Sequence, residues 1–182
     1  MTNNRKELAR EVQTRLNAGE SKQDIYSALK GKFHAASVER SLAQWPCPAD
    51  KEKNRYLNYP LLIIAGFFAI LKILLLIGMF RSAESSSVLP LLPVTVIPIL
   101  LYIYVIYGIK NCNLFGYLLM MLLSIQSILS LSHIGFSSPK AMMLFAMSAA
   151  ALLLSWLQKT RLFPNTSIFL RHKRDADGNI LF

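Results

Sequence analysis

The scarcity of charge between Pro60 and Leu157 is the feature that most constrains the fold of this chain. That stretch contains five charged side chains, Lys72, Arg81, Glu84, Lys110 and Lys140. A soluble domain has about 25% charged residues, and a soluble chain of this size could not bury so much apolar surface in a core of its own. We therefore expect residues 60–158 to lie in a lipid bilayer.

Four segments of this stretch are long enough to cross a membrane. A helix spans the hydrocarbon core with about 20 apolar residues, because each residue adds about 1.5 Å along the axis. The segments that reach this length are residues 60–80, 88–109, 114–134 and 141–157. Their connections are short, which forces neighbouring helices to run antiparallel. The sequence thus predicts an all-α fold with a compact four-helix, up-down transmembrane bundle.

The distribution of Lys and Arg predicts the orientation of this bundle. If the N-terminus is cytoplasmic, seventeen basic residues flank the spans on that side, and Arg81 and Lys140 flank them on the other. Flanks rich in Lys and Arg stay in the cytoplasm. We therefore expect both termini to be cytoplasmic, in a membrane such as the bacterial inner membrane. Cys47 and Cys112 would then be free thiols.

Residues 1–50 predict a small basic helical domain in the cytosol. Three apolar stripes recur at helical spacing, and the pair Ser21 and Asp24 forms a capping box at the start of the second. The stripes contain Leu8, Val12 and Leu16, then Ile25, Ala28 and Leu29, then Val38, Leu42 and Trp45. Three short helices with one stripe each can pack around a common, small core.

The aromatic side chains Tyr26, Phe33 and Trp45 have two interpretations in this domain. They complete the small core, which we favour, or they are exposed contacts for a cytosolic protein partner. The stretch from residue 21 to residue 45 also resembles a helix-turn-helix, although the spacing is about two residues too long and no clear recognition set follows Ala36. Nucleic acid is therefore the less favoured partner, and a membrane-anchored DNA binder stays an alternative.

Basic residues flank the bundle on both sides in the chain. Residues 51–59 form a basic linker before the first span, and residues 159–182 form a basic tail after the last. The net charge of +10 and the position of these residues favour anionic lipid headgroups as partners. The predicted headgroup contacts are Lys51, Lys53, Arg55, Arg171, Lys173 and Arg174.

A polar cluster is predicted inside the bundle. Lys72 and Gln126 each lie twelve residues into spans that run the same way, and Ser130 follows Gln126 on the same helix face. Pro98 cannot donate a hydrogen bond to the carbonyl of Val94. Gln126, Ser130 and that carbonyl are candidate acceptors for the Lys72 ammonium, which suggests a site for an ion, a substrate or a headgroup. The alternative, which we favour, is structural: Lys72 snorkels and the polar groups join helices.

Small residues gather on the fourth span. Ala146, Ser148 and residues 149–151 leave little side-chain volume on this helix. Small residues let helix backbones approach closely in membranes. We expect a tight contact there, either within the bundle or with a second copy in a homo-oligomer.

The sequence contains no recognisable catalytic, cofactor-binding or metal-binding set. The two cysteines and three histidines have no metal-ligand spacing, and no Asp or Glu lies inside a predicted span. The favoured function is a non-enzymatic, partner-binding or regulatory membrane protein. The predicted architecture is similar in shape, though in no motif, to small bacterial immunity proteins that protect against pore-forming toxins. The alternative is a small transporter or channel subunit whose path passes Lys72, Gln126 and Pro98.

Overall fold

The computed structural model describes residues 2–82, 92–134 and 138–166, together with His172, Arg174 and Ile180. Within these residues the fold is all-α, apart from two isolated antiparallel bridges that pair Thr166 with His172 and Arg174 with Ile180. The helices are α1 Thr2–Asn17, α2 Lys22–Leu29, α3 Ala35–Ala43, α4 Pro48–Asn54, η1 Arg55–Leu57, α5 Asn58–Ser82, α7 Leu92–Lys110, α8 Leu114–Ile134 and α9 Pro139–Leu162.

The first three helices form the predicted N-terminal domain around one small core. The predicted capping box is present: the backbone N–H of Asp24 donates to Ser21 Oγ at 3.2 Å. Tyr26, Phe33 and Trp45 are partly buried and pack against the core, so they belong to it as we favoured. The buried core residues are Leu8, Val12, Leu16, Ile25, Leu29, Val38 and Leu42.

The junction between this domain and the bundle is helical rather than an extended linker. Pro48 begins α4, because a first-turn proline has no N–H that needs an acceptor. η1 then leads directly into α5. The linker predicted at residues 51–59 is therefore a continuation of the helical chain. Residues 30–34 separate α2 from α3, which is longer than the turn of three or four residues typical of a helix-turn-helix.

Three of the predicted spans correspond to helices that are long and apolar enough to cross a membrane, namely α5, α8 and α9. The remaining one corresponds to α7, whose described apolar part, Val96–Lys110, is shorter. The predicted start of that span at residue 88 lies outside the described residues. Passage of α7 through the membrane thus remains a prediction.

The last helix continues five residues beyond the predicted end of its span. α9 ends at Leu162, and Lys159 and Arg161 occupy its last turn. Cationic side chains stabilise a helix C-terminus through the helix dipole, so these charges do not end the helix. Lys159 Nζ also donates to the carbonyl oxygen of Thr166 at 2.8 Å, which holds the chain that follows.

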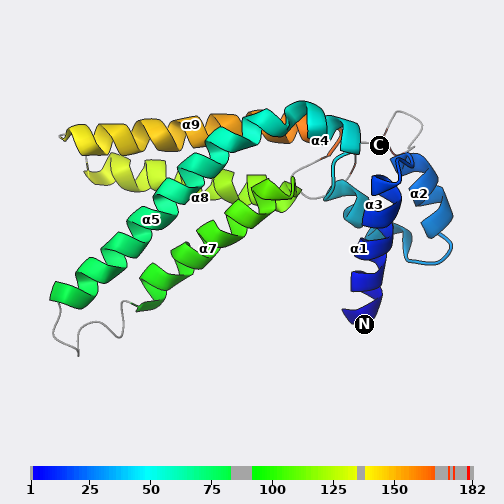
Figure 1. Cartoon of the computed structure of the whole chain (residues 1–182), viewed down its shortest axis with the longest axis horizontal. Coiled ribbons are helices and arrows are strands. Elements are labelled where there is room, and N and C mark those ends of the chain that lie inside the picture. Colours follow the sequence, from blue (N-terminus) through cyan, green and yellow to red (C-terminus); the bar gives the residue numbers. More distant parts are fainter. Residues whose placement is uncertain are drawn as a thin grey trace.

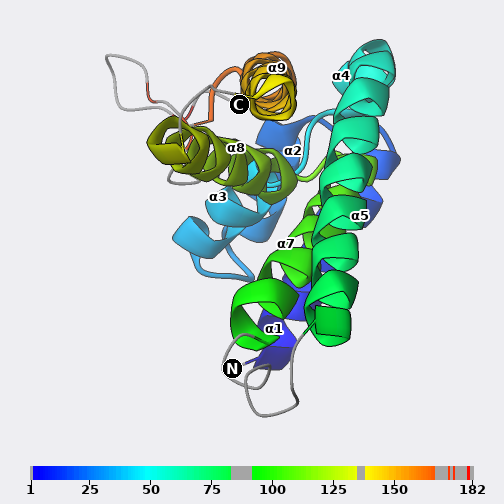
Figure 2. The same cartoon turned by 90° about the vertical axis from the view of Figure 1, so that its left-hand side faces the viewer.

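The predicted bundle is less compact than expected because its helices form two diverging pairs. α5 lies beside α7 and α8 lies beside α9 (Figures 1 and 2). We call the end near the N-terminal domain the proximal end, where α5 begins and α7 ends; the pairs separate away from it (Figure 1). At the proximal end a Cβ on Gly108 would meet Gly116 Cα at 2.7 Å, so the backbones of α7 and α8 touch. Farther along, Tyr102, Met120 and Leu123 fill the interior.

Part of the small-residue set of the last span makes the predicted tight contact inside the bundle, whereas Ala146 and Ala150 are exposed. Ser148, Ala151 and Ser155 on α9 are fully buried. Ser148 Oγ donates to the carbonyl oxygen of Leu144 at 2.9 Å and lies 3.0 Å from Ser127 Oγ on α8. This face of α9 is therefore used against α8, and the expectation of a homo-oligomer gains no support from it.

Candidate functional site

The residues of the predicted polar cluster line one cavity between the two helix pairs. Its volume is about 350 Å³. Lys72 reaches it from α5, Pro98 from α7, and Gln126 and Ser130 from α8. We call it the Lys72 cavity. Lys72 and Gln126, which residue counting placed at one depth, thus line the same space, together with Pro98 from a third helix.

Lys72 forms neither of the candidate hydrogen bonds to Gln126 and Ser130. Among the described residues, Lys72 Nζ has no hydrogen bond and no ion pair. Ser130 Oγ instead donates to the backbone carbonyl of Gln126 at 2.9 Å. The ammonium and the Gln126 side chain are consequently available to a ligand.

The lining of the Lys72 cavity is amphipathic. Its polar groups are one ammonium, one amide and the hydroxyls of Tyr102, Ser127 and Ser130, and none of the described lining residues carries a carboxylate. The remaining surface is apolar and comes from Phe68, Leu71, Leu75, Pro98, Leu123, Leu131 and Leu144. A cation beside apolar walls favours a ligand with an anionic group and an apolar body.

A buried polar network that we did not predict ties the proximal end together. Its centre is Asn58, whose Oδ1 accepts from the Tyr117 hydroxyl at 2.7 Å and from Gln158 Nε2 at 2.8 Å. Asn58 Nδ2 donates to the carbonyl oxygen of Ile109 at 3.3 Å and lies 3.2 Å from Cys112 Sγ. These contacts join α5, the end of α7, α8 and α9, and we call them the proximal network.

The sequence held a weak signal for this network. Asn58 lies just before the first predicted span and was assigned to the linker, and Gln158 lies just after the last span, at the end of the predicted bundle. In the structure Asn58 is 5% exposed and Gln158 is fully buried. Two amides at neighbouring ends of antiparallel helices could have suggested the pairing. The partner Tyr117 was not distinguishable from other interfacial tyrosines.

The predicted headgroup contacts divide into two groups. Lys51 and Arg55 line a second cavity, of about 620 Å³, where the N-terminal domain meets the proximal end. Lys53 is exposed on α4 but does not line it. Arg174 is exposed in the tail. Arg171 and Lys173 lie outside the described residues.

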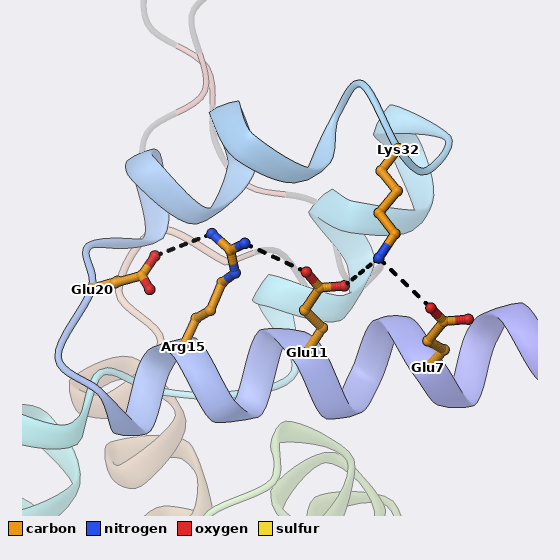
Figure 3. A network of polar contacts seen from close by, with 5 residues as sticks. All are labelled: Glu7, Glu11, Arg15, Glu20 and Lys32. Carbon is orange, nitrogen blue, oxygen red and sulfur yellow. Dashed lines mark hydrogen bonds and ion pairs between the residues drawn. The ribbon is translucent and has the colours of Figure 1, made fainter.

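Acidic side chains of the N-terminal domain pair with its own cations. Lys32 Nζ lies 3.3 Å from a Glu11 carboxylate oxygen and 3.7 Å from one of Glu7. Arg15 contacts Glu11 at 3.5 Å and Glu20 at 3.4 Å (Figure 3). Exposed pairs of this kind contribute little to stability, about 0–1 kcal/mol each. These pairs offset part of the positive charge of α1, and among the described residues Lys51 and Arg55 form no such pair.

Within the described part of the chain, no group of three or more His, Cys, Asp or Glu residues could hold a metal ion. Cys47 and Cys112 are free cysteines. In comparisons with protein-family models, curated proteins and solved structures, the chain has no significant match.

Proposed function

We propose that this is a four-span membrane protein, with both termini in the cytoplasm, that works by binding rather than by catalysis. Its ligand is an anionic amphiphile bound in the Lys72 cavity. The observation that carries the proposal is the convergence of Lys72, Gln126 and Ser130 on a cavity whose other walls are mostly apolar. The helix lengths and their apolar composition support the membrane setting.

The position of Lys72 carries a free-energy cost that a bound anion would reduce. An ammonium in the hydrocarbon region without a partner costs several kcal/mol. Snorkelling reduces this cost where the side chain can reach the interface, but Lys72 faces a cavity between helices. A bound anion offsets the cost directly, and the amide of Gln126 can donate to the same anionic group.

The arrangement of the helices gives such a ligand a route from the bilayer. The two pairs diverge away from the proximal end (Figure 1), and the cavity lies between them. Leu74 and Leu75 on α5 are each 58% exposed, next to the lysine in the chain. An acyl chain can lie along such a surface while its anionic end reaches Lys72. The same route would serve a small transporter or channel subunit, the alternative function.

The test compares wild type with Lys72→Met, purified as the full chain in a neutral detergent. The probe is laurate, with dodecanol as the uncharged equivalent, and the readout is the thermal unfolding midpoint. We expect laurate to raise the midpoint of the wild type, dodecanol to have little effect, and Lys72→Met to lose the laurate response. Lys140→Met removes an exposed lysine at the start of α9 and should keep it. An equal response of wild type and Lys72→Met would overturn the proposal.

A second candidate function is docking of a cytosolic protein on the N-terminal domain. It is favoured by the separation of two cores: the domain core contains residues of α1, α2 and α3, and the bundle core contains none of these. The exposed α1 side chains Arg10 and Thr14 offer a surface away from the core. We expect Arg10→Glu to reduce co-purification of a partner with the full chain while the laurate response persists. Unchanged co-purification would count against docking at α1.

A further inference from the structure

The cavity at the junction between the N-terminal domain and the bundle gathers three cations from distant parts of the chain. Lys51 comes from α4, Arg55 from η1 and Lys110 from the last residue of α7. We call this space the junction cavity. Its volume is about 620 Å³. The fold therefore brings Lys110 to two residues that are more than fifty positions away in the sequence.

These cations lack protein partners in the part of the chain that the structure describes. The ion pairs found there lie within the N-terminal domain and involve Arg15 and Lys32 (Figure 3). Among the described residues that line the junction cavity, three carry a positive charge and Glu52 alone carries a negative one. Like charges repel when they gather in one space. A multivalent anion would remove that repulsion.

The other lining groups fit a phosphate group attached to an apolar body. Gln13 and Asn17 on α1 and Asn111 after α7 supply amide N–H donors. Arginine and lysine are the preferred binders of phosphate oxygens, the former through its planar fork. Trp45, Tyr59 and Leu62 also line the cavity. Tryptophan and tyrosine are typical of the membrane interface, where a phospholipid headgroup lies.

We propose that the junction cavity binds a phosphate-bearing headgroup, with Lys51, Arg55 and Lys110 as its ligands. The acyl chains of an anionic phospholipid would pass Tyr59 and Leu62 into the bilayer along α5. Because α1 and α7 both line the cavity, the bound headgroup joins the N-terminal domain to the bundle. The inference does not depend on the Lys72 cavity and concerns different residues.

The test measures binding to the full chain in a neutral detergent, by the shift in thermal unfolding and by retention of lipid in native mass spectrometry. The probes are a short-chain phosphatidylglycerol, phosphatidylcholine of the same chain length, and inorganic phosphate. We expect wild type to bind phosphatidylglycerol at least about tenfold more tightly than phosphatidylcholine. Binding of inorganic phosphate alone, without a preference between the lipids, would support the phosphate site but assign it to a soluble ligand.

Three single variants and one matched control separate this site from general surface charge. Lys51→Gln, Arg55→Gln and Lys110→Gln should each weaken binding of phosphatidylglycerol about three- to tenfold. Lys53→Gln removes an equal charge from α4 at a position outside the cavity and should leave the affinity unchanged. An equal loss in Lys53→Gln and Lys110→Gln would show diffuse surface attraction and would overturn the proposal. So would failure of wild type to bind both phosphatidylglycerol and inorganic phosphate.

The two proposed sites can fail independently. If the junction cavity binds phospholipid, Lys110→Gln should weaken the phospholipid response and keep the laurate response. Lys72→Met should do the opposite. Loss of both responses in either variant, with its unfolding midpoint unchanged, would mean that the two cavities are not separate sites and would overturn the assignment to the junction cavity.

Discussion

The Tyr117 hydroxyl on α8 donates to Asn58 Oδ1 at the start of α5 across 2.7 Å, where Asn58 is 5% exposed and Tyr117 is fully buried. The same oxygen accepts from Gln158 Nε2 on α9. A single amide thus joins three helices that are far apart in the sequence. Asn58 and the Tyr117 hydroxyl have partners here, whereas Gln158 Oε1 has none among the described residues. Paired buried polar groups favour one arrangement of a core, because another arrangement would leave them unpaired. The proximal network therefore fixes the end from which the helix pairs diverge.

Tyr117→Phe is the first test of this role. The variant removes one hydrogen bond and leaves Gln158 still paired with Asn58, so the expected loss is about 1 kcal/mol in the free energy of unfolding. Asn58→Leu should cost more, because the Tyr117 hydroxyl and the Gln158 amide then lose an acceptor in a buried place. Unfolding midpoints of the full chain in detergent measure both. Tyr56→Phe removes an exposed hydroxyl and is the control. If Tyr56→Phe lost as much stability as Tyr117→Phe, the role assigned to Tyr117 would be contradicted.

The close backbone contact between α7 and α8 at the proximal end should make alanine destabilising at Gly108. In Gly108→Ala the added Cβ would lie 2.7 Å from Gly116 Cα, and a backbone cannot yield as a flexible side chain does. We expect this variant to lose about 1–3 kcal/mol of stability through overpacking.

Gly66→Ala on α5 is the matched control, because nothing lies within 4 Å of its added Cβ. There alanine should be neutral or stabilising by up to about 1 kcal/mol, since glycine is the poorer helix former. Equal unfolding midpoints for Gly108→Ala and Gly66→Ala would show that α7 and α8 do not touch at these glycines.

The helices of this chain follow from local signals that residue type alone supplies. α8 has the predicted bounds, since Asn113 accepts from the N–H of Phe115 just before a continuous apolar run. The capping pair Ser21 and Asp24 likewise defines the start of α2. Such signals act over three or four residues, and they do not depend on which helices become neighbours.

The contacts between helices were harder to predict because they depend on packing across the chain. Counting residues placed Lys72 and Gln126 at one depth, and both line one cavity. Residue counting gives the depth of a side chain but not its direction around the helix axis. It therefore could not show whether Lys72 hydrogen-bonds to Gln126 or Ser130. The junction cavity was missed for a related reason: Lys110 was treated as a loop residue, and nothing local connects it with Arg55.

The burial of Lys22 should make the stability of the N-terminal domain depend on pH. Lys22 is 7% exposed, and burial lowers the pKa of its ammonium below 10.5, although nearby Cys47 and Asp50 partly oppose this. In the unfolded chain the pKa returns to its ordinary value, so between the two pKa values the unfolded state binds more protons. Stability of the N-terminal domain should therefore rise with pH through that window, and below it the cost of the buried charge is fully present.

Lys22→Met tests this directly. The variant should be more stable than wild type at neutral pH, and its stability should lack the rise at alkaline pH. Lys30→Met, at an exposed position after α2, should keep the wild-type pH profile. The check is a series of chemical denaturation curves between pH 7 and pH 11, about the range that the ordinary lysine pKa requires. A rise that persists in Lys22→Met would assign it to other groups.

Lys72→Met without any ligand separates function from structure in the bundle. Methionine has a similar length and no charge, and among the described residues Lys72 has no protein partner to lose. Lys72 is half-buried, and replacing an unpaired, half-buried charge by an apolar side chain is expected to be neutral or stabilising, by up to about 3 kcal/mol. The measurement is the unfolding midpoint in a detergent free of anionic amphiphiles, together with the oligomeric state. A more stable Lys72→Met protein means that the lysine is retained at a cost, which favours a binding role. A variant that unfolds earlier or dissociates means that Lys72 supports the bundle itself, and the proposed ligand would then be unnecessary to explain it.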